Sequence, residues 1–407
     1  MLRRTAFRYC SMPIAAALSV ILAAYAAKPQ SHNVSPNIAQ SKRSEAPPAR
    51  QLYLAGRVPF SAPPPMAIVA GVQCDADGNI YARYSPALPN RFTLPKLPLT
   101  RISLASRSVV QFHVPTPEGY AFVQSQGFYV EPDGSVYGLL AAYRQQPGPK
   151  AVPNFPVPMV VRYQDDGTVD SVIKLQLPQG VHVQPFRLAV FPDGHLLMTG
   201  LVMNSPGRLP PSTGVFTGIF DRGGGYAGPL TLPDDVKPKP MGQVRVFRPG
   251  ASTSPGNARA KGIPTAPHKP MNAWFLDVMF GFMLGSPDGN VYLFRASSPA
   301  RLYVLSSGGT VLRRVVINPP VPGMIPSEAS LTSEGALLLR FSQPMGAENA
   351  QPSQVLALAD PGTGKITETY KAPPRAGAPA CASPEDEILF LRESKVGHLE
   401  VAEYLPR

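Results

Sequence analysis

The sequence has few charged side chains, few aromatic residues and no dense run of basic residues. Charged residues make up 16% and aromatic residues 8% of the 407 residues, and there is one tryptophan. Hydrophobic residues make up 44%, a share that excludes a disordered chain. The net charge is +12, but the lysines and arginines are dispersed, so we expect no nucleic-acid partner.

Familiar catalytic motifs are also missing. No Gly-x-Ser-x-Gly segment is present, and the histidines occur singly, without the spacing of metal ligands. The acidic turns described below offer one carboxylate each, too few oxygens for calcium. We therefore expect no cofactor and no metal, and the sequence indicates no catalytic residue. The histidines are His32, His113, His182, His195, His268 and His398.

Proline and glycine are abundant, with 50 and 35 residues respectively. Proline is excluded from helix interiors and from central strands, so a chain this rich in it has many turns and sheet edges. This composition favours an all-β protein with long loops and excludes a helical bundle.

The N-terminus has the order of a signal peptide. Three arginines precede the apolar run Met12–Ala24, and residues 24–26 form a small-x-small cleavage site. We expect residues 1–26 to be removed and the protein to be secreted, periplasmic or extracellular, with no membrane span. The alternative is an uncleaved membrane anchor, for which the apolar run is short. Residues 27–50 read as a flexible linker.

One short phrase recurs six times between residues 72 and 389: an apolar stretch, an acidic turn and a second apolar stretch. Asp-Gly supplies the positive φ of a tight turn, and the flanking residues favour strands, so each copy predicts a hairpin. The sixth copy has lost its glycine. The turns centre on Asp77-Gly78, Asp133-Gly134, Asp193-Gly194, Asp288-Gly289, Glu334-Gly335 and Glu385-Asp386.

A second hairpin follows these copies, and two hairpins make a four-stranded antiparallel propeller blade. The repeat therefore predicts a six-bladed β-propeller over residues 51–407. The sixth copy has room for only three strands: Pro379–Ser383, Glu387–Arg392 and His398–Tyr404. The segment Gln51–Arg57 precedes the first copy and has no blade of its own. We expect it to complete the last blade and close the ring.

On these turns, the chain resembles the six-bladed propellers of the TolB-like and NHL-repeat superfamily. The matching residues read Asp-Gly-(Asn/Ser)-(Ile/Val)-Tyr at 77–81, 133–137 and 288–292. The resemblance implies architecture and not activity, since members include calcium-dependent lactonases, lyases and binding modules. The lactonase type needs a central Glu, Asn and Asp set, which has no residue-by-residue match in this sequence.

Two cysteines, Cys74 and Cys381, remain after signal removal. They end the inner strands of the first and last blades, which are neighbours across the predicted closure. Export permits a disulfide, which would stabilise the fold by roughly 4–5 kcal/mol in the chain-entropy model. The alternative is two buried free thiols.

A long step between the third and fourth copies indicates a basic, Pro/Gly-rich insertion at about residues 234–279. Arg245 and Arg248 within it are candidate ligand contacts. Trp274 is either part of a ligand site or a core residue. A degenerate seventh blade around residues 243–247 is the alternative to a loop.

These features favour a monomeric binding or scaffold propeller whose partner is a protein, a polysaccharide or a small molecule. The alternative is a hydrolase or lyase, lactonase-like, with its site at the mouth of the central channel. Three or more Asp, Glu, Asn or His side chains converging there would favour the enzyme, whereas an arginine-lined or apolar mouth would favour binding.

Overall fold

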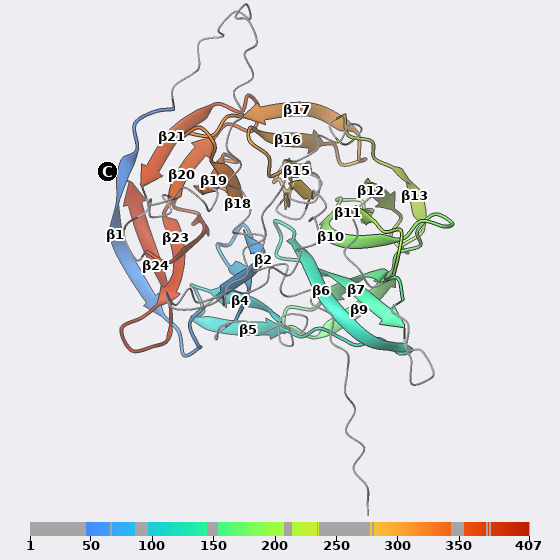
Figure 1. The fold of residues 1–407 in the computed structure, drawn as a ribbon. Helices are drawn as coiled ribbons and strands as arrows, with labels where there is room; N and C mark the ends of the chain where they lie inside the picture. Colours follow the sequence, from blue (N-terminus) through green and yellow to red (C-terminus); the bar gives the residue numbers. More distant parts are fainter. Residues whose placement is uncertain are drawn as a thin grey trace, which may run out of the picture.

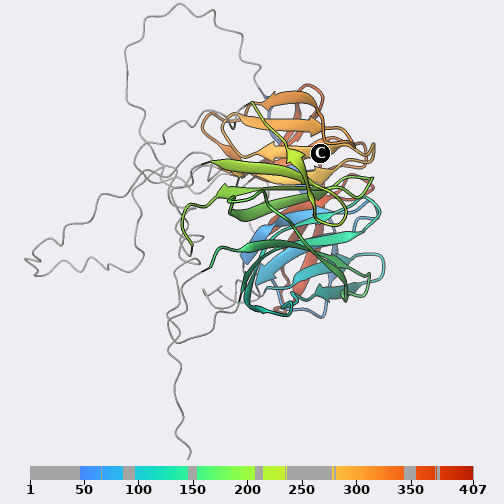
Figure 2. The same cartoon turned by 90° about the vertical axis from the view of Figure 1, so that its right-hand side faces the viewer.

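The chain folds into β-sheets set radially around one axis, as Figure 1 shows in a view along that axis and Figure 2 from the side. The structure is a computed structural model that describes residues 46–65, 67–85, 97–144, 154–206, 214–233, 235, 277–278, 281–342, 354–371, 373 and 376–406. Within these ranges, no helix is long and apolar enough to cross a membrane.

Four sheets are separate blades of four antiparallel strands, and in each the chain runs from the inner strand to the outer one. The first contains β2 (Ala67–Cys74), β3 (Ile80–Ser85), β4 (Leu99–Ser103) and β5 (Ser108–Phe112); the second β6 (Tyr120–Val130), β7 (Val136–Arg144), β8 (Val157–Tyr163) and β9 (Val169–Lys174); the third β10 (Val183–Val190), β11 (Leu196–Val202), β12 (Val215–Phe220) and β13 (Tyr226–Pro229); the fourth β14 (Phe282–Gly285), β15 (Val291–Arg295), β16 (Ala300–Leu305) and β17 (Val311–Ile317).

The remaining eight strands form one sheet in the order β18-β19-β20-β21-β1-β24-β23-β22. They are β18 (Ile325–Leu331), β19 (Leu337–Ser342), β20 (Gln354–Ala359), β21 (Ile366–Lys371), β1 (Arg50–Pro59), β24 (Leu399–Pro406), β23 (Ile388–Glu393) and β22 (Ala378–Ala382).

The prediction of six separate blades is therefore wrong as it stands, because four separate blades are present. The last eight strands merge because β1, before it reaches β24, runs parallel to β21 for two residue pairs, Arg50↔Tyr370 and Gln51↔Lys371. Each half of this sheet still contains four strands: β18 to β21 in hairpin order, and β22 to β24 in hairpin order with β1 added to β24.

The acidic turns connect the inner strand of each set of four to the next strand, and all six have the same geometry. The first residue of each turn exchanges backbone hydrogen bonds with the fourth and fifth residues, as in Glu131 with Gly134 and Ser135. The fourth residue has a φ near +80° in the five copies with glycine. In the sixth copy, Asp386 takes that place at a φ of 61°, because aspartate tolerates the left-handed region better than most residues.

The core lies between the faces of neighbouring sheets. One cluster joins the first two blades through residues such as Phe112 and Tyr163, whose rings meet edge to face with centroids 5.4 Å apart. Another joins the first blade to the last strands through Val72, Ile80 and Leu389. Because each apolar face is covered by the next sheet, the arrangement buries both faces only when it runs right round the axis.

The N-terminal strand closes this circle, as predicted. β1 pairs antiparallel with β24 from Leu52↔Pro406 to Pro59↔Glu400, with one irregularity after Leu54. In Figure 1, β1 lies in blue on the outer rim beside the red β24. The first described strand thus completes the sheet formed by the last three.

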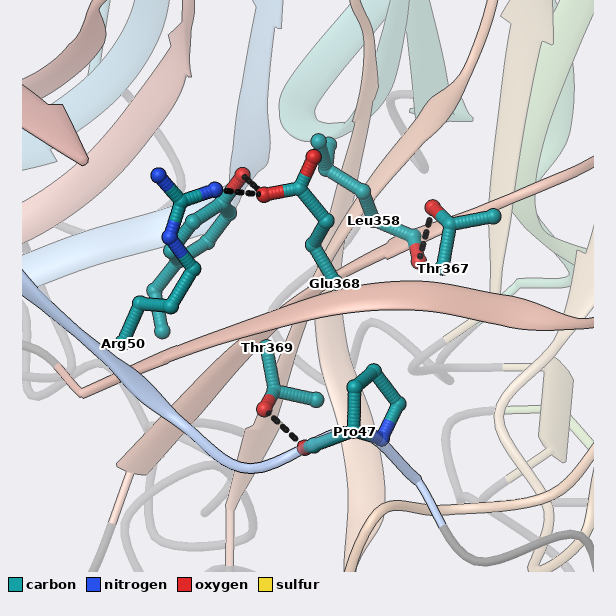
Figure 3. A network of polar contacts seen from close by, with 7 residues as sticks. Pro47, Arg50, Leu358, Thr367, Glu368 and Thr369 are labelled. Atoms are coloured by element: carbon teal, nitrogen blue, oxygen red, sulfur yellow. Dashed lines mark hydrogen bonds and ion pairs between the residues drawn. The ribbon is translucent and has the colours of Figure 1, made fainter. Parts of the chain in front are cut away.

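Contacts with β21 hold the start of β1 in place, as Figure 3 shows. The Arg50 guanidinium lies 2.5 Å from a carboxylate oxygen of Glu368, which also accepts a 2.8 Å hydrogen bond from the Tyr370 hydroxyl. The Thr369 hydroxyl donates to the Pro47 carbonyl at 2.7 Å. Residues within the predicted linker 27–50 therefore make contacts with the propeller.

A disulfide joins Cys74 at the end of β2 to Cys381 in β22, with the Cα atoms 6.3 Å apart. The sequence left open a disulfide or two free thiols, and the structure contains the disulfide. It links the inner strands on either side of the closure, while β1 and β24 link the outer ones.

The left-handed turn position gives a first prediction. Gly335→Ala will lower the free energy of unfolding by about 1 kcal/mol, because a side chain at a φ of +79° is strained even where no atom lies within 4 Å. Urea denaturation measures it. The matched control is Gly308→Ala, in another turn, which has no positive φ and where a Cβ would make only an ordinary 3.9 Å contact with the Ser306 hydroxyl oxygen; this variant will be neutral. Equal losses in both variants would refute the explanation.

The disulfide gives a second prediction. The double variant Cys74→Ser/Cys381→Ser will lose up to about 5 kcal/mol of stability, because the bond closes a chain segment of 307 residues. Thermal and urea denaturation of the oxidised protein and the variant measure the loss. Reduction of the native protein by dithiothreitol will produce the same shift and will leave the variant unchanged. An unchanged midpoint in the variant would contradict the prediction.

Candidate functional site

The inner strands carry β-bulges close to the axis. The bulge shifts the pairing between Ser125 and Phe128 in β6 and between Pro185 and Arg187 in β10, and β2, β18 and β22 have comparable irregularities. Bulges re-aim side chains and are frequent next to binding and active sites. The inner part of the propeller is therefore where functional side chains are expected to converge.

Neighbouring inner strands contact one another all the way round, from β2 through β6, β10, β14, β18 and β22 back to β2. Side chains fasten some of these contacts. The Gln73 amide donates to the Phe128 carbonyl at 2.8 Å and accepts from the Val130 backbone N–H at 2.9 Å. At Gly127, a Cβ would lie 2.6 Å from the Phe186 carbonyl oxygen, so only glycine allows β6 and β10 to approach this closely.

Arg83 of β3 is the largest charged group inside this region. Its side chain is 1% exposed, and its Nη1 donates to the backbone carbonyl of Gln126. The guanidinium carbon lies 5.8 Å from the centroid of the Phe128 ring. Its Nε and Nη2 have no hydrogen-bond partner, and no ion pair involves Arg83 within the described residues. Buried donors of this kind cost about 1–3 kcal/mol each when unsatisfied.

A second arginine, Arg187 of β10, lies near Arg83. Its Nε donates to the Gly281 carbonyl, and its Nη1 donates to the Phe186 carbonyl at 3.3 Å. Burial lowers the pKa of both arginines to about 10, and the charge of Arg83 adds to the lowering at Arg187. A pKa of about 10 still leaves both guanidinium groups protonated at neutral pH, so two positive charges lie close together.

Neutral hydrogen-bonding groups adjoin the arginines. Tyr163 of β8 interacts electrostatically with Arg83, and burial raises the pKa of its phenol to about 12, so it stays neutral. The hydroxyl of Tyr163 and the Nε2 of Gln126 are buried without a hydrogen-bond partner. The region therefore offers several hydrogen-bond donors to a ligand, and none of the ion pairs found among the described residues involves Arg83.

The acid on β18 is already paired. Glu328 lies 3.2 Å from Nη2 of Arg340, whose Nε donates to the Ser327 hydroxyl at 2.9 Å. Burial raises the pKa of Glu328, and Arg340 opposes that rise. In the part of the chain that the structure describes, no group of three or more His, Cys, Asp or Glu side chains could hold a metal ion.

A cavity of about 250 Å³ lies elsewhere, beside the turns of the third and fourth blades. It holds Asp193, His195 and Ser307, and the His195 Nδ1 lies 2.9 Å from an oxygen of Asp193. Both side chains are largely exposed. The largest effect on the pKa of Asp193 is the hydrogen bond from the backbone N–H of His195, which lowers it. Aspartates in turns commonly accept such a bond.

Of the residues predicted from the sequence to form a bond or a ligand contact, the structure brings together Cys74 and Cys381. Arg245, Arg248 and Trp274 lie outside the described residues, as does almost all of the insertion 234–279. His113 directly follows β5. Arg83 and Arg187 were not predicted as site residues, although each is the one charged residue of a largely apolar strand, and that signal could have marked them.

Comparisons with known proteins identify no family for this chain. No protein-family model matches the sequence, and no curated protein matches it. Among solved structures, the chain is similar to a streptogramin B lyase, with 10% identity, a TM-score of 0.38, and coverage of 88% of this chain and 98% of the lyase.

Two further similarities are of the same order. A Dyadobacter fermentans protein of unknown function has 11% identity and a TM-score of 0.49 and covers 88% of this chain and 99% of its own. A Xanthomonas campestris gluconolactonase has 12% identity and a TM-score of 0.43 and covers 87% and 99%. The sheets themselves define the class, which is a β-propeller, and no activity is transferred from these structures.

Arg83 gives the third prediction. Arg83→Met will leave the stability of the ligand-free protein unchanged or raise it by about 1 kcal/mol, because an unpaired buried charge is replaced by an apolar side chain of similar length. Urea denaturation measures it. The control, Arg340→Met, will lose about 2 kcal/mol, because it leaves Glu328 without its partner. An equal loss in both variants would make Arg83 a structural residue.

Proposed function

We propose that the protein is an exported, non-catalytic binding propeller that takes a small anionic ligand beside Arg83 and Arg187. The observation that carries this proposal is the Arg83 guanidinium, which is 1% exposed and has two nitrogens without partners. An anion would supply both the missing acceptors and the missing charge.

Binding is favoured over catalysis by the protonation states of the site. General acid–base catalysis needs a group whose pKa lies near the working pH. Arg83 and Arg187 titrate near 10 and Tyr163 near 12, so all three keep their protons at neutral pH. Groups of this kind hold an anion without exchanging protons with it.

The proposal extends to the cellular setting and the architecture. The N-terminal segment 1–26 acts as a signal peptide, the mature protein is a monomer in the periplasm or outside the cell, and the disulfide favours such an oxidising compartment. We also propose that the two halves of the eight-stranded sheet act as a fifth and a sixth blade, because only two residue pairs join β1 to β21. A distant relation to the TolB-like and NHL-repeat propellers is part of the same proposal.

A hydrolase is the second candidate function, and the cavity near the turns favours it. Asp193, His195 and Ser307 line that cavity together, and they are the residue types of a nucleophilic triad. Activity against nitrophenyl esters that is lost in His195→Ala and Ser307→Ala, and kept in Arg83→Met, would support this reading over the first.

A ligand screen gives the fourth prediction. In thermal-shift assays at constant ionic strength, small organic anions will raise the melting temperature of the native protein, and neutral sugars and amines will not. A ligand at a hundred times its Kd stabilises by about 2.7 kcal/mol, which is a readily measured shift. The Arg83→Met variant will show no anion-dependent shift. Equal shifts in native protein and variant would rule out the site.

A further inference from the structure

The unpartnered nitrogens of Arg83 are the two that form one edge of a guanidinium. Nε–H and one N–H of Nη2 point in the same direction, side by side, and this fork matches the two oxygens of a carboxylate. Nη1, on the other edge, is held by the Gln126 carbonyl. We propose that this edge binds the carboxylate group of a small organic acid in a bidentate manner. The inference rests on the proposed anion site and specifies its ligand.

The surroundings of Arg83 hold its guanidinium in one orientation, with the Nε/Nη2 edge unpartnered. The Phe128 ring lies near the guanidinium, with its centroid 5.8 Å from the carbon, and the bond from Nη1 to the Gln126 carbonyl fixes the rotation of the group. A planar ligand group in the plane of the guanidinium meets both free N–H groups at once. Such a pre-organised fork loses little side-chain entropy on binding.

Arg187 and Arg340 do not offer a second fork of the same kind. The Nε of Arg187 is bonded to the Gly281 carbonyl, so its corresponding edge is in use. Arg340 is paired with Glu328. The open edge of Arg83 matches a carboxylate, which is planar and carries one negative charge. A phosphate dianion carries more charge, and its tetrahedral oxygens need additional donors.

Neutral donors complete the site for a carboxylate. Each carboxylate oxygen has a second lone pair, and the Tyr163 hydroxyl and the Gln126 amide nitrogen are buried and unpartnered. Tyr163 is close enough to interact electrostatically with Arg83. We assign both groups as donors of hydrogen bonds to the remaining lone pairs of the carboxylate.

The test is calorimetric titration of the disulfide-bonded full chain with acetate, propionate, benzoate, phosphate and chloride at one ionic strength. Carboxylates are expected to bind at least tenfold more tightly than phosphate or chloride. Arg83→Lys keeps the charge and removes the fork, and it will weaken carboxylate binding at least tenfold. Arg83→Met will abolish it. The matched control, Arg162→Lys on the exposed face of β8, will bind as the native protein does.

A second readout separates binding from folding defects. In ¹H–¹⁵N spectra of arginine side chains, the Nε–H signal that disappears in Arg83→Lys will shift downfield when a carboxylate is added to the native protein. If phosphate and chloride bind as tightly as carboxylates and Arg83→Lys retains them, the bidentate inference fails while the anion site stands. If no anion binds the native protein, both fail.

Discussion

The antiparallel pairing of β1 with β24 is the constraint on which the rest of the structure depends. Each sheet is apolar on two faces and is covered only by its neighbours, so an open seam would expose a whole core cluster such as the one around Val72, Ile80 and Leu389. β1 supplies the outer strand of that last sheet, and the Cys74–Cys381 bond ties the inner strands across the same seam. The position of every side chain near the axis follows from this closure.

Closure also explains how the middle of the molecule comes to contain the unpaired charge of Arg83. The inner strands meet all round the axis, and the bulge in β10 lies next to Arg187, whose Nε donates to the Gly281 carbonyl. Arg83 reaches the neighbouring blade at the Gln126 carbonyl. Such an arrangement is costly in the ligand-free protein, and proteins accept such costs chiefly at sites that bind something.

Much of the fold could be predicted because its signals are local. The acidic turns fix hairpins through positive-φ positions, and the sixth was recognised without glycine, where Asp386 takes the left-handed conformation. The leftover strand near Leu52 and the incomplete last repeat together predicted the closure. The fusion of two sheets was not foreseen, because it depends on β1 passing β21 at Arg50 and Gln51, a contact between distant segments.

The candidate site was harder to predict for a related reason. Arg83 and Arg187 are separated by a hundred residues and belong to different blades, so no spacing in the sequence associates them. Their proximity depends on the order of the blades around the axis and on bulges that cannot be predicted from the sequence of one strand. What the sequence does contain is a charge within an apolar strand, which is informative only once the strand is known to face the interior.

The closure also determines when the first strand can pair during biosynthesis. β1 is among the first strands to be made, but its long antiparallel partner is β24, residues 399–406. Until the ribosome has delivered that segment, β1 has no partner for most of its length, and the sheet pairs between them can form only afterwards. A chain threaded through an export channel from its N-terminus would therefore travel with its first strand unpaired and reach its final shape only after release.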